Sequence, residues 1–210
     1  MKALLVKGVF HWGFSVRIVT ESAGAQQYLL PPPSTLTGAL SYGLSISKAL
    51  SECITKKGKK VKLFSRVVKL ADAIKWATFA FSDEASIDGH AAAIGYSDFI
   101  RSFRLIYQRG ARHSWEQQDM WYGVSAHGKV YACGTGFKTV YIVDEQKLKE
   151  LGFRDEDLLI AAFSIVRIGA REGLVSILDV NLSNRIEIVR SFFIRGHQQF
   201  LHPHRACRVT

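Results

Sequence analysis

Apolar residues along the chain follow two patterns. Short runs rich in β-branched and aromatic residues predict strands at 3–10, 73–81, 101–108, 129–143 and 174–180. Two longer segments, which begin near Ser34 and at Asp155, repeat apolar residues every three to four positions and predict helices. When the central segment is left aside, the predicted order is strand, helix, strand, strand, helix, strand.

This order, with a long insertion in its middle, predicts an α+β protein with a ferredoxin-like fold, which RNA-recognition motifs share. The insertion spans about 83–128. The run 129–143 is interrupted by a bulge or tight bend at Gly134-Thr135-Gly136. We expect one domain over 1–182 and a C-terminal extension over 183–210, whose role the sequence leaves open.

The first predicted helix follows three consecutive prolines, Pro31 to Pro33. Proline presets the backbone for a first helical turn, and Ser34 or Thr35 can cap the helix by accepting a hydrogen bond from a free amide. We expect the helix to end at Lys56-Lys57-Gly58. Its apolar positions include Leu36, Leu40, Leu44, Leu50 and Ile54. The free amides at its start can bind a phosphate, although a well-capped structural helix has the same pattern.

Three glycines carry information about the helices. Gly38 and Gly43 lie inside the first helix, where glycine costs about 1 kcal/mol relative to alanine. Such glycines indicate that another backbone comes close. The second helix is expected to be capped by Asp155 and closed by Gly169.

Positive charge is concentrated in one part of the sequence. The chain carries 28 Lys and Arg against 18 Asp and Glu, a formal charge of +10, and residues 1–70 alone contribute 11 basic and 2 acidic side chains. Because cations that neutralise phosphates release condensed counterions, this excess indicates a polyanionic partner such as nucleic acid. Solubility alone is the other explanation for a high net charge.

Composition excludes several classes of protein. An apolar share of 48% and a charged share of 22% are ordinary for a globular protein. The three cysteines, Cys53, Cys133 and Cys207, show neither metal-ligand spacing nor a disulfide framework. No apolar run is long enough to cross a membrane, and no signal peptide is recognisable. We therefore expect a cytoplasmic protein with no membrane association, no metal and no cofactor.

Arginine and aromatic residues gather in the insertion. Four arginines, at 101, 104, 109 and 112, are interleaved with Phe103, Tyr107, His113 and Trp115, and we expect a hairpin tip at Arg109-Gly110-Ala111-Arg112. Guanidinium groups pair with phosphates while aromatic rings stack on unpaired bases, so the cluster predicts contact with RNA. A solvated hairpin packed by its own aromatic residues is the alternative.

Two parts of the sequence resemble a known family. They are HWGFSVR at 11–17 together with YLLPPPSTLTGALSYG at 28–43, and, far downstream, RIGAREGLVS at 167–176. The first part resembles the start of the Cas-five family of CRISPR-associated RAMP proteins, in particular its archaeal type I-A branch. The second part is similar to that family's glycine-flanked basic turn between the second helix and the last strand.

The resemblance implies a ferredoxin-like RAMP fold with a β-hairpin thumb. It also implies a non-catalytic subunit of a type I CRISPR surveillance (Cascade) complex, which binds and caps the 5′ handle of crRNA in antiviral defence. The implied partners are the crRNA, Cas-seven-type backbone subunits and a Cas-eight-type large subunit.

The candidate RNA-binding residues follow from these patterns. For Trp12 two interpretations stay open, a platform for base stacking and a core residue. Arg171 lies between Gly169 and Gly173, and glycines let a backbone approach phosphate closely. The lysine run from Lys56 to Lys62 is most often a solvated turn. The full set of candidates is His11, Trp12, Ser34, Thr35, Arg101, Arg104, Arg109, Arg112, Arg167 and Arg171.

No catalytic residue is predicted. Metal-independent RNA cleavage needs a base, an acid and a cation at the phosphate. His11, His90, His113 and His127 are conceivable bases, but their spacing fixes no catalytic pair. A relative in type I-C systems cleaves precursor RNA, so an endoribonuclease that processes pre-crRNA is the first alternative.

Two further alternatives belong to other classes. A general RRM-like RNA-binding protein outside CRISPR would carry an aromatic octapeptide on its third strand, which KVYACGTG at 129–136 matches poorly. A metabolic enzyme would show a Walker loop, a Rossmann fingerprint or a nucleophile elbow, and none is found.

Overall fold

The structure of the chain is a computed structural model. It describes residues 1–18, 24–25, 27–51, 53–56, 62–83, 94–105, 122–184, 186–189 and 206–209. No helix in these described segments is both long enough and apolar enough to cross a membrane.

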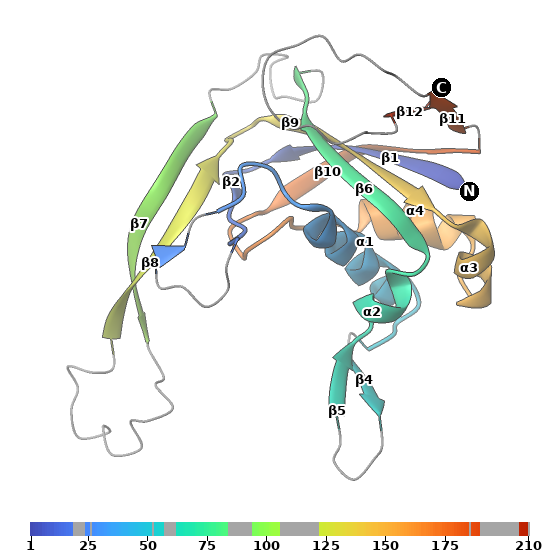
Figure 1. Cartoon of the computed structure of the whole chain (residues 1–210), viewed down its shortest axis with the longest axis horizontal. Coiled ribbons are helices and arrows are strands. Elements are labelled where there is room, and N and C mark those ends of the chain that lie inside the picture. Colours follow the sequence, from blue (N-terminus) through green and yellow to red (C-terminus); the bar gives the residue numbers. More distant parts are fainter. Residues whose placement is uncertain are drawn as a thin grey trace.

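Four antiparallel strands form the main sheet, in the order β10-β1-β9-β6 (Figure 1). They are β1 (Lys2–Phe10), β6 (Ile74–Phe81), β9 (Gly136–Val143) and β10 (Val175–Ser183). β1 lies in the interior of the sheet, where Leu5 pairs with Val140 of β9 on one side and Asn181 of β10 on the other. The predicted combination of helices with an antiparallel sheet is confirmed.

Two helices cover one face of this sheet (Figure 1). They are α1 (Pro33–Ser47), which packs on β6, and α4 (Asp155–Phe163), which packs on β10. Tyr141 of β9 is fully buried between sheet and helix, and its hydroxyl donates to the Leu36 carbonyl oxygen at 3.3 Å. The largest fully buried side chains are Tyr141, Phe10, Phe14, Phe137, Leu4, Leu36, Leu40, Leu44, Leu70, Leu148, Leu158 and Ile168.

A second group of strands extends away from the main sheet (Figure 1). β8 (Tyr122–Tyr131) pairs with β7 (Gly95–Leu105), β2 (Gly13–Phe14) and β3 (Gly24–Ala25). The β7–β8 ladder is antiparallel and runs from the pair Gly95 and Tyr131 to the pair Leu105 and Tyr122. The predicted run 129–143 is therefore two strands in two sheets, β8 and β9, because the chain turns at Gly134 with φ at 64°.

Several short elements were not predicted. They are the two-residue strands β2 and β3, the hairpin β4 (Cys53–Lys56) and β5 (Lys62–Ser65), the helices α2 (Val67–Leu70) and α3 (Glu145–Glu150), and the pair β11 (Ile186–Val189) and β12 (Ala206–Val209). The last pair lies in the C-terminal extension. Each element is at most six residues long, too short for a periodic pattern to identify it.

Both ends of α1 differ from the prediction. The N-cap is Pro32, and neither Ser34 nor Thr35 caps the helix, because the helix already begins at Pro33. The helix ends at Ser47, after which Ala49 takes a left-handed φ of 50° and the Leu50 amide donates to the Ser45 carbonyl at 2.7 Å. Ile54 lies in β4 and not in the helix, because residues 53–56 pair with 62–65.

The bounds of α4 also correct the prediction. Its N-cap is Arg154 rather than Asp155, and the Asp157 carboxylate accepts a hydrogen bond from the Arg154 amide at 2.8 Å. The helix ends at Phe163, so Gly169 does not close it. Gly169 lies instead in the turn that leads to β10.

The backbones of the two helices come close together at Gly43. A Cβ atom on this glycine would lie 2.1 Å from the Ala161 carbonyl oxygen of α4, a distance that no real contact allows. At Gly38 an added Cβ would meet no heavy atom within 4 Å. The prediction that a second backbone comes close is therefore confirmed for Gly43 and wrong for Gly38.

This difference gives a matched stability test. Gly43→Ala should lower the free energy of unfolding by about 1–3 kcal/mol, because α1 and α4 must separate to admit the methyl group. Gly38→Ala should raise it by about 1 kcal/mol, because alanine favours a helix and meets no obstacle. Urea unfolding of both variants measures the two effects. Equal effects of the two substitutions would contradict the packing described.

An ion pair joins the same two helices. The Asp157 carboxylate lies 2.8 Å from Lys48 Nζ at the end of α1, and its side chain is 8% exposed. The hydrogen bond from Lys48, followed by that from the Arg154 amide, lowers the pKa of Asp157. A carboxyl whose pKa is lower in the folded than in the unfolded chain stabilises the fold above its unfolded pKa, and this stabilisation is lost as the pH falls.

Asp157→Asn should therefore reduce stability at pH 7 by about 1–3 kcal/mol, the usual contribution of a hydrogen bond to a charged group. As the pH falls through the lowered folded-state pKa of Asp157, the carboxyl becomes protonated in the native chain as well, and the variant and the native chain should converge. Denaturant unfolding at neutral and acid pH checks this. A deficit of the same size at both pH values would mean that the carboxylate charge has no part in it.

Candidate functional site

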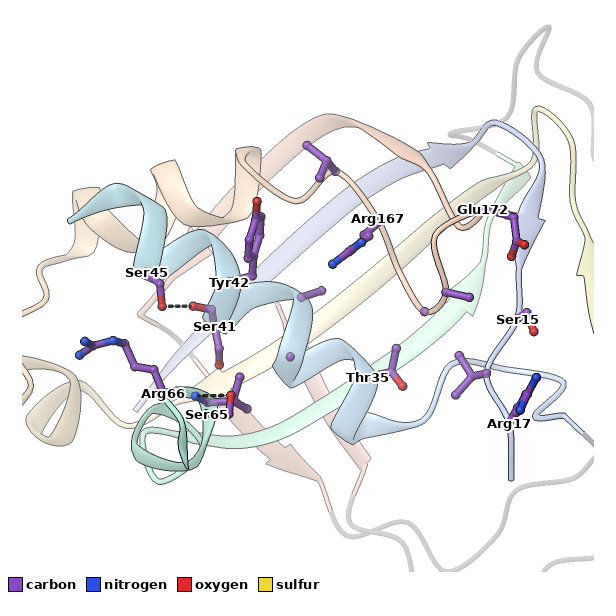
Figure 2. A pocket seen from close by; sticks show the side chains of 17 residues that line it. Ser15, Arg17, Thr35, Ser41, Tyr42, Ser45, Ser65, Arg66, Arg167 and Glu172 are labelled. Atoms are coloured by element: carbon purple, nitrogen blue, oxygen red, sulfur yellow. Dashed lines mark hydrogen bonds between the residues drawn. The ribbon is translucent and has the colours of Figure 1, made fainter. Parts of the chain in front are cut away.

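A groove of about 600 Å³ lies along the exposed side of α1 (Figure 2). Its floor is the helix itself. One wall is the segment Ser65 to Val67, the opposite wall is the turn after α4, and Ser15 to Arg17 closes the end near the start of α1. The lining residues are Ser15, Val16, Arg17, Thr35, Gly38, Ala39, Ser41, Tyr42, Ser45, Ser65, Arg66, Val67, Val166, Arg167, Gly169, Ala170 and Glu172.

The floor is formed mostly by small residues. Gly38, Ala39, Ser41 and Ser45 place no long side chain in the groove, and only Tyr42 is large. The open space above Gly38 belongs to this groove, because nothing lies within 4 Å of a Cβ built there. The sequence GALSYGLS thus gives a helix surface that a flat ligand can approach closely.

Three arginines from separate parts of the chain line the groove. Arg17 lies near the start of α1, Arg66 lies across from Ser41 and Ser45, and Arg167 lies in the wall that follows α4 (Figure 2). The nitrogens of all three have no carboxylate oxygen of a described residue within 4.0 Å.

Among the described residues that line the groove, Glu172 is the one acidic residue, so together with the three arginines they carry a formal charge of +2. The Nε atom of Arg66 donates to the Ser51 carbonyl oxygen at 2.7 Å, which fixes the direction of its guanidinium group. A concave surface with uncompensated positive charge attracts anions, and guanidinium groups match phosphate geometry.

The wall that carries Arg167 is a tight turn. The Ile168 amide donates to the Gly173 carbonyl at 2.8 Å, and the Gly173 amide donates to the Ala170 carbonyl at 2.9 Å. Gly169 has φ at +86°, and a Cβ on it would lie 2.9 Å from the Ser15 carbonyl oxygen. Only glycine fits both conditions, so the glycine brings this turn against the segment at Ser15.

The segment Ser15 to Arg17 connects the groove to the β7–β8 ladder. The Ser15 carbonyl accepts from the Ala170 amide at 3.0 Å, and the Ser15 hydroxyl donates to the Gly128 carbonyl of β8 at 2.8 Å. Arg17 forms an antiparallel bridge with Gln27, just before the three prolines. One short segment therefore contacts the turn, the second sheet and the approach to α1.

The structure brings together only some of the residues that the sequence singled out. Thr35 and Arg167 both line the groove, at opposite walls. Ser34 is exposed in the first turn of α1, and Arg171 is exposed in the turn between Gly169 and Gly173, but neither lines the groove.

His11 and Trp12 lie at the end of β1, outside the groove lining. The Trp12 side chain is 62% exposed, so it is not a core residue. The His11 Nε2 atom lies 2.9 Å from the Ser176 hydroxyl oxygen. In the part of the chain that the structure describes, no group of three or more His, Cys, Asp or Glu side chains could hold a metal ion.

The four arginines of the insertion stay predictions. Arg101 and Arg104 belong to β7, where their backbones pair with Ala126 and Gly123, and their side chains are not among those described. Arg109 and Arg112 lie outside the described residues.

Arg17, Arg66 and Ser41 are groove residues that were not among the sequence candidates. Arg17 is the last residue of the motif HWGFSVR, so its place in that motif was a usable signal. Arg66 lies between the short elements β5 and α2, and no sequence pattern singles it out. Ser41 lies in the helix motif, but its burial depends on the packing around α1.

Proteins already known are similar to this chain over most of its length. No protein-family model matches it. The "CRISPR-associated protein Cas5 2" of Saccharolobus solfataricus is 29% identical over 185 residues, which is 87% of this chain and 62% of that protein. The "CRISPR system aCascade subunit Cas5 1" of the same organism is 31% identical over 172 residues, which is 82% of this chain and 61% of that protein.

A solved structure, described as that of a CRISPR protein from Archaeoglobus fulgidus, aligns with 89% of this chain and 63% of its own, at 18% identity and a TM-score of 0.44. The chain thus spans less than two thirds of the length of the curated relatives. The sequence matches define a class, the CRISPR-associated proteins. Within that class, all three matched relatives are Cas5 (Cas-five) proteins, which supports assigning the chain to that family.

Proposed function

We propose that the chain is a non-catalytic subunit of a type I CRISPR surveillance (Cascade) complex, and that its groove binds the 5′ handle of crRNA. The arginine-lined groove over α1 carries this proposal. It combines three guanidinium groups, Arg17, Arg66 and Arg167, with a floor of small residues. The two kinds of surface suit the two parts of a nucleotide, the phosphate and the base.

The dimensions of the groove favour a single strand. A volume of about 600 Å³ lies within the range of small-molecule sites and suits about one or two nucleotides. The arginines are spread along the groove, from Arg17 near the start of α1 to Arg66 near Ser45 (Figure 2). Successive phosphates of one strand could therefore each meet a cation, while an unpaired base lies over the small floor.

The strand order supports a ferredoxin-like RAMP fold for this subunit. Counting only the main-sheet strands and the two covering helices, the chain order is β1, α1, β6, β9, α4, β10, and the sheet order is β10-β1-β9-β6. A split βαβ arrangement of this kind is the ferredoxin-like pattern. In the proposed domain over 1–182, the β7–β8 ladder would be the hairpin thumb of the insertion 83–128.

The family supports the proposed setting. One relative is named as an aCascade subunit, so a multi-subunit ribonucleoprotein is the natural assembly to propose for this chain. Its partners would be the crRNA, Cas-seven-type backbone subunits and a Cas-eight-type large subunit, in a complex that works in the cytoplasm. Holding an RNA end in such a complex needs positioning and charge, and it needs no catalytic group.

Replacing the three groove arginines tests the site. Arg17→Gln, Arg66→Gln and Arg167→Gln in one variant should lower affinity for a short single-stranded RNA about tenfold or more. The slope of log K against log salt concentration should fall by about 2, at about 0.7 for each phosphate that is no longer neutralised. Fluorescence anisotropy of a labelled RNA over a salt series measures both quantities, and the RNA should be recovered uncut.

The matched control removes three cations outside the groove. Lys147→Gln, Lys149→Gln and Arg154→Gln gives the same formal charge of +7, three below the native +10. None of these residues lines the groove. Equal falls in affinity for the two triple variants would show that RNA responds only to net charge, and the groove would then not be the site.

The thumb requires its own test. Replacing Arg101, Arg104, Arg109 and Arg112 together by alanine should reduce the amount of guide RNA that co-purifies with the tagged protein from its native cells. The reason is the loss of guanidinium groups that pair with phosphates. Unchanged retention of guide RNA would remove the thumb arginines from the proposed interface and leave the groove unaffected.

A further inference from the structure

The Ser41 hydroxyl is a buried polar group that the fold leaves without a partner. Ser41 is 1% exposed, and its Oγ atom has no hydrogen-bond partner among the described residues. A hydroxyl removed from water without a compensating hydrogen bond costs free energy of folding. Ser41 also lines the groove over α1. The residue that carries the unpaired hydroxyl therefore lines the groove where a ligand would bind.

The same helix shows how such a hydroxyl is usually satisfied. One turn later, the Ser45 hydroxyl donates to the Ser41 carbonyl oxygen at 3.0 Å. Near the end of the helix, the Ser47 hydroxyl donates to the Leu44 carbonyl oxygen at 3.0 Å. Ser41 has the carbonyl of Thr37 one turn before it and makes no hydrogen bond to it. Among the described residues, its hydroxyl thus lacks the hydrogen bond that the other two serines make within α1.

Two polar atoms of the nearest wall already have partners within the chain. Figure 2 shows the Ser41 side chain extending from α1 toward Ser65 and Arg66. The Ser65 hydroxyl accepts from the Val67 amide at 3.3 Å, and Arg66 Nε donates to the Ser51 carbonyl. The Ser41 hydroxyl lies beside this wall and has no hydrogen-bond partner among the described residues.

We propose that Ser41 determines specificity in this groove by hydrogen-bonding the edge of one nucleobase of a single-stranded RNA. This inference rests on the function proposed above. A hydroxyl can both donate and accept, and a base edge offers single donors and acceptors in a thin, flat group that can reach a nearly buried atom. A phosphate would instead need several donors and a cation around it. The arginines hold the backbone, and Ser41 reads the base.

The space beside Ser41 agrees with a planar ligand. Gly38 and Ala39 have little or no side chain, so the space above this part of the helix is open. No heavy atom lies within 4 Å of a Cβ built on Gly38. A base can therefore lie along the helix while its edge points to Ser41. Because the hydroxyl pairs only when RNA is bound, its cost in the free chain is recovered on binding.

Two alanine variants of α1 separate this role from a structural one. Ser41→Ala removes the unpaired hydroxyl, and Ser47→Ala removes a satisfied hydroxyl outside the groove. The full chain and both variants are incubated with a random-sequence pool of short single-stranded RNAs, and the bound RNAs are sequenced. Melting temperatures are measured beside the selection. Ser41→Ala should melt no lower than Ser47→Ala, since it leaves no group unpaired and alanine favours a helix.

The native chain and Ser47→Ala should enrich one base at one position. Ser41→Ala should lose that preference and bind the preferred RNA about fivefold more weakly, as expected for one hydrogen bond. If Ser41→Ala keeps the same preference, or if the native chain binds RNA without any base preference, the role of Ser41 is overturned while the groove remains an RNA site. If no form binds RNA, the proposed function fails, and the role of Ser41 fails with it.

Discussion

The close approach of α1 and α4 at Gly43 is the constraint on which the rest of the structure depends. With no side chain at Gly43, the Ala161 carbonyl of α4 can lie against the backbone of α1. This contact fixes the spacing of the two helices on the sheet. It therefore also fixes where the chain leaves α4 and forms the turn with Arg167, which is one wall of the groove. A change of helix spacing would change the width of the groove.

The positive charge of the groove takes no part in the ion pairs that join elements of the fold. Arg17, Arg66 and Arg167 come from three parts of the sequence, and within the described residues none is neutralised by a carboxylate. Elsewhere cations are used to join elements, as Lys48 is with Asp157 and as Lys2 is with Asp155 at 2.5 Å. Cations that join elements stabilise the fold, whereas cations without a partner are available to a ligand. The positive charge seen in the sequence thus includes both kinds.

Much of the fold was predictable because its main elements have strong local patterns. Three of the four sheet strands and the two covering helices were found from their local patterns, in the observed order, whereas β9 was predicted only as part of one run with β8. The prediction failed where tertiary contacts override local preference. Ile54 continued the helical pattern, yet residues 53–56 form a strand because 62–65 lie beside them. The break at Gly134 was seen, but its effect, the transfer of the chain from one sheet to the other, depends on what each strand pairs with.

The candidate site was predicted only in part, for a related reason. Thr35 and Arg167 lie in motifs whose pattern indicated an anion site, and both line the groove. Arg66 reaches the groove through the β4–β5 hairpin, whose existence no periodic pattern indicated. No sequence feature distinguishes Ser41 from other serines on a helix, and its burial is visible only in the structure. The burial of a side chain and its lack of a hydrogen-bond partner both result from tertiary packing. Neither can be predicted from local sequence patterns.

The most direct measurement is photo-crosslinking of the full chain to a single-stranded RNA that contains 4-thiouridine, followed by mass spectrometry of the crosslinked peptides. The account predicts crosslinks within α1 at 33–47, at 65–67 and in the turn at 166–172, the three sides of the groove. Crosslinks confined to other surfaces, such as the exposed strand β6 near Trp76, would contradict the claim that the groove binds RNA.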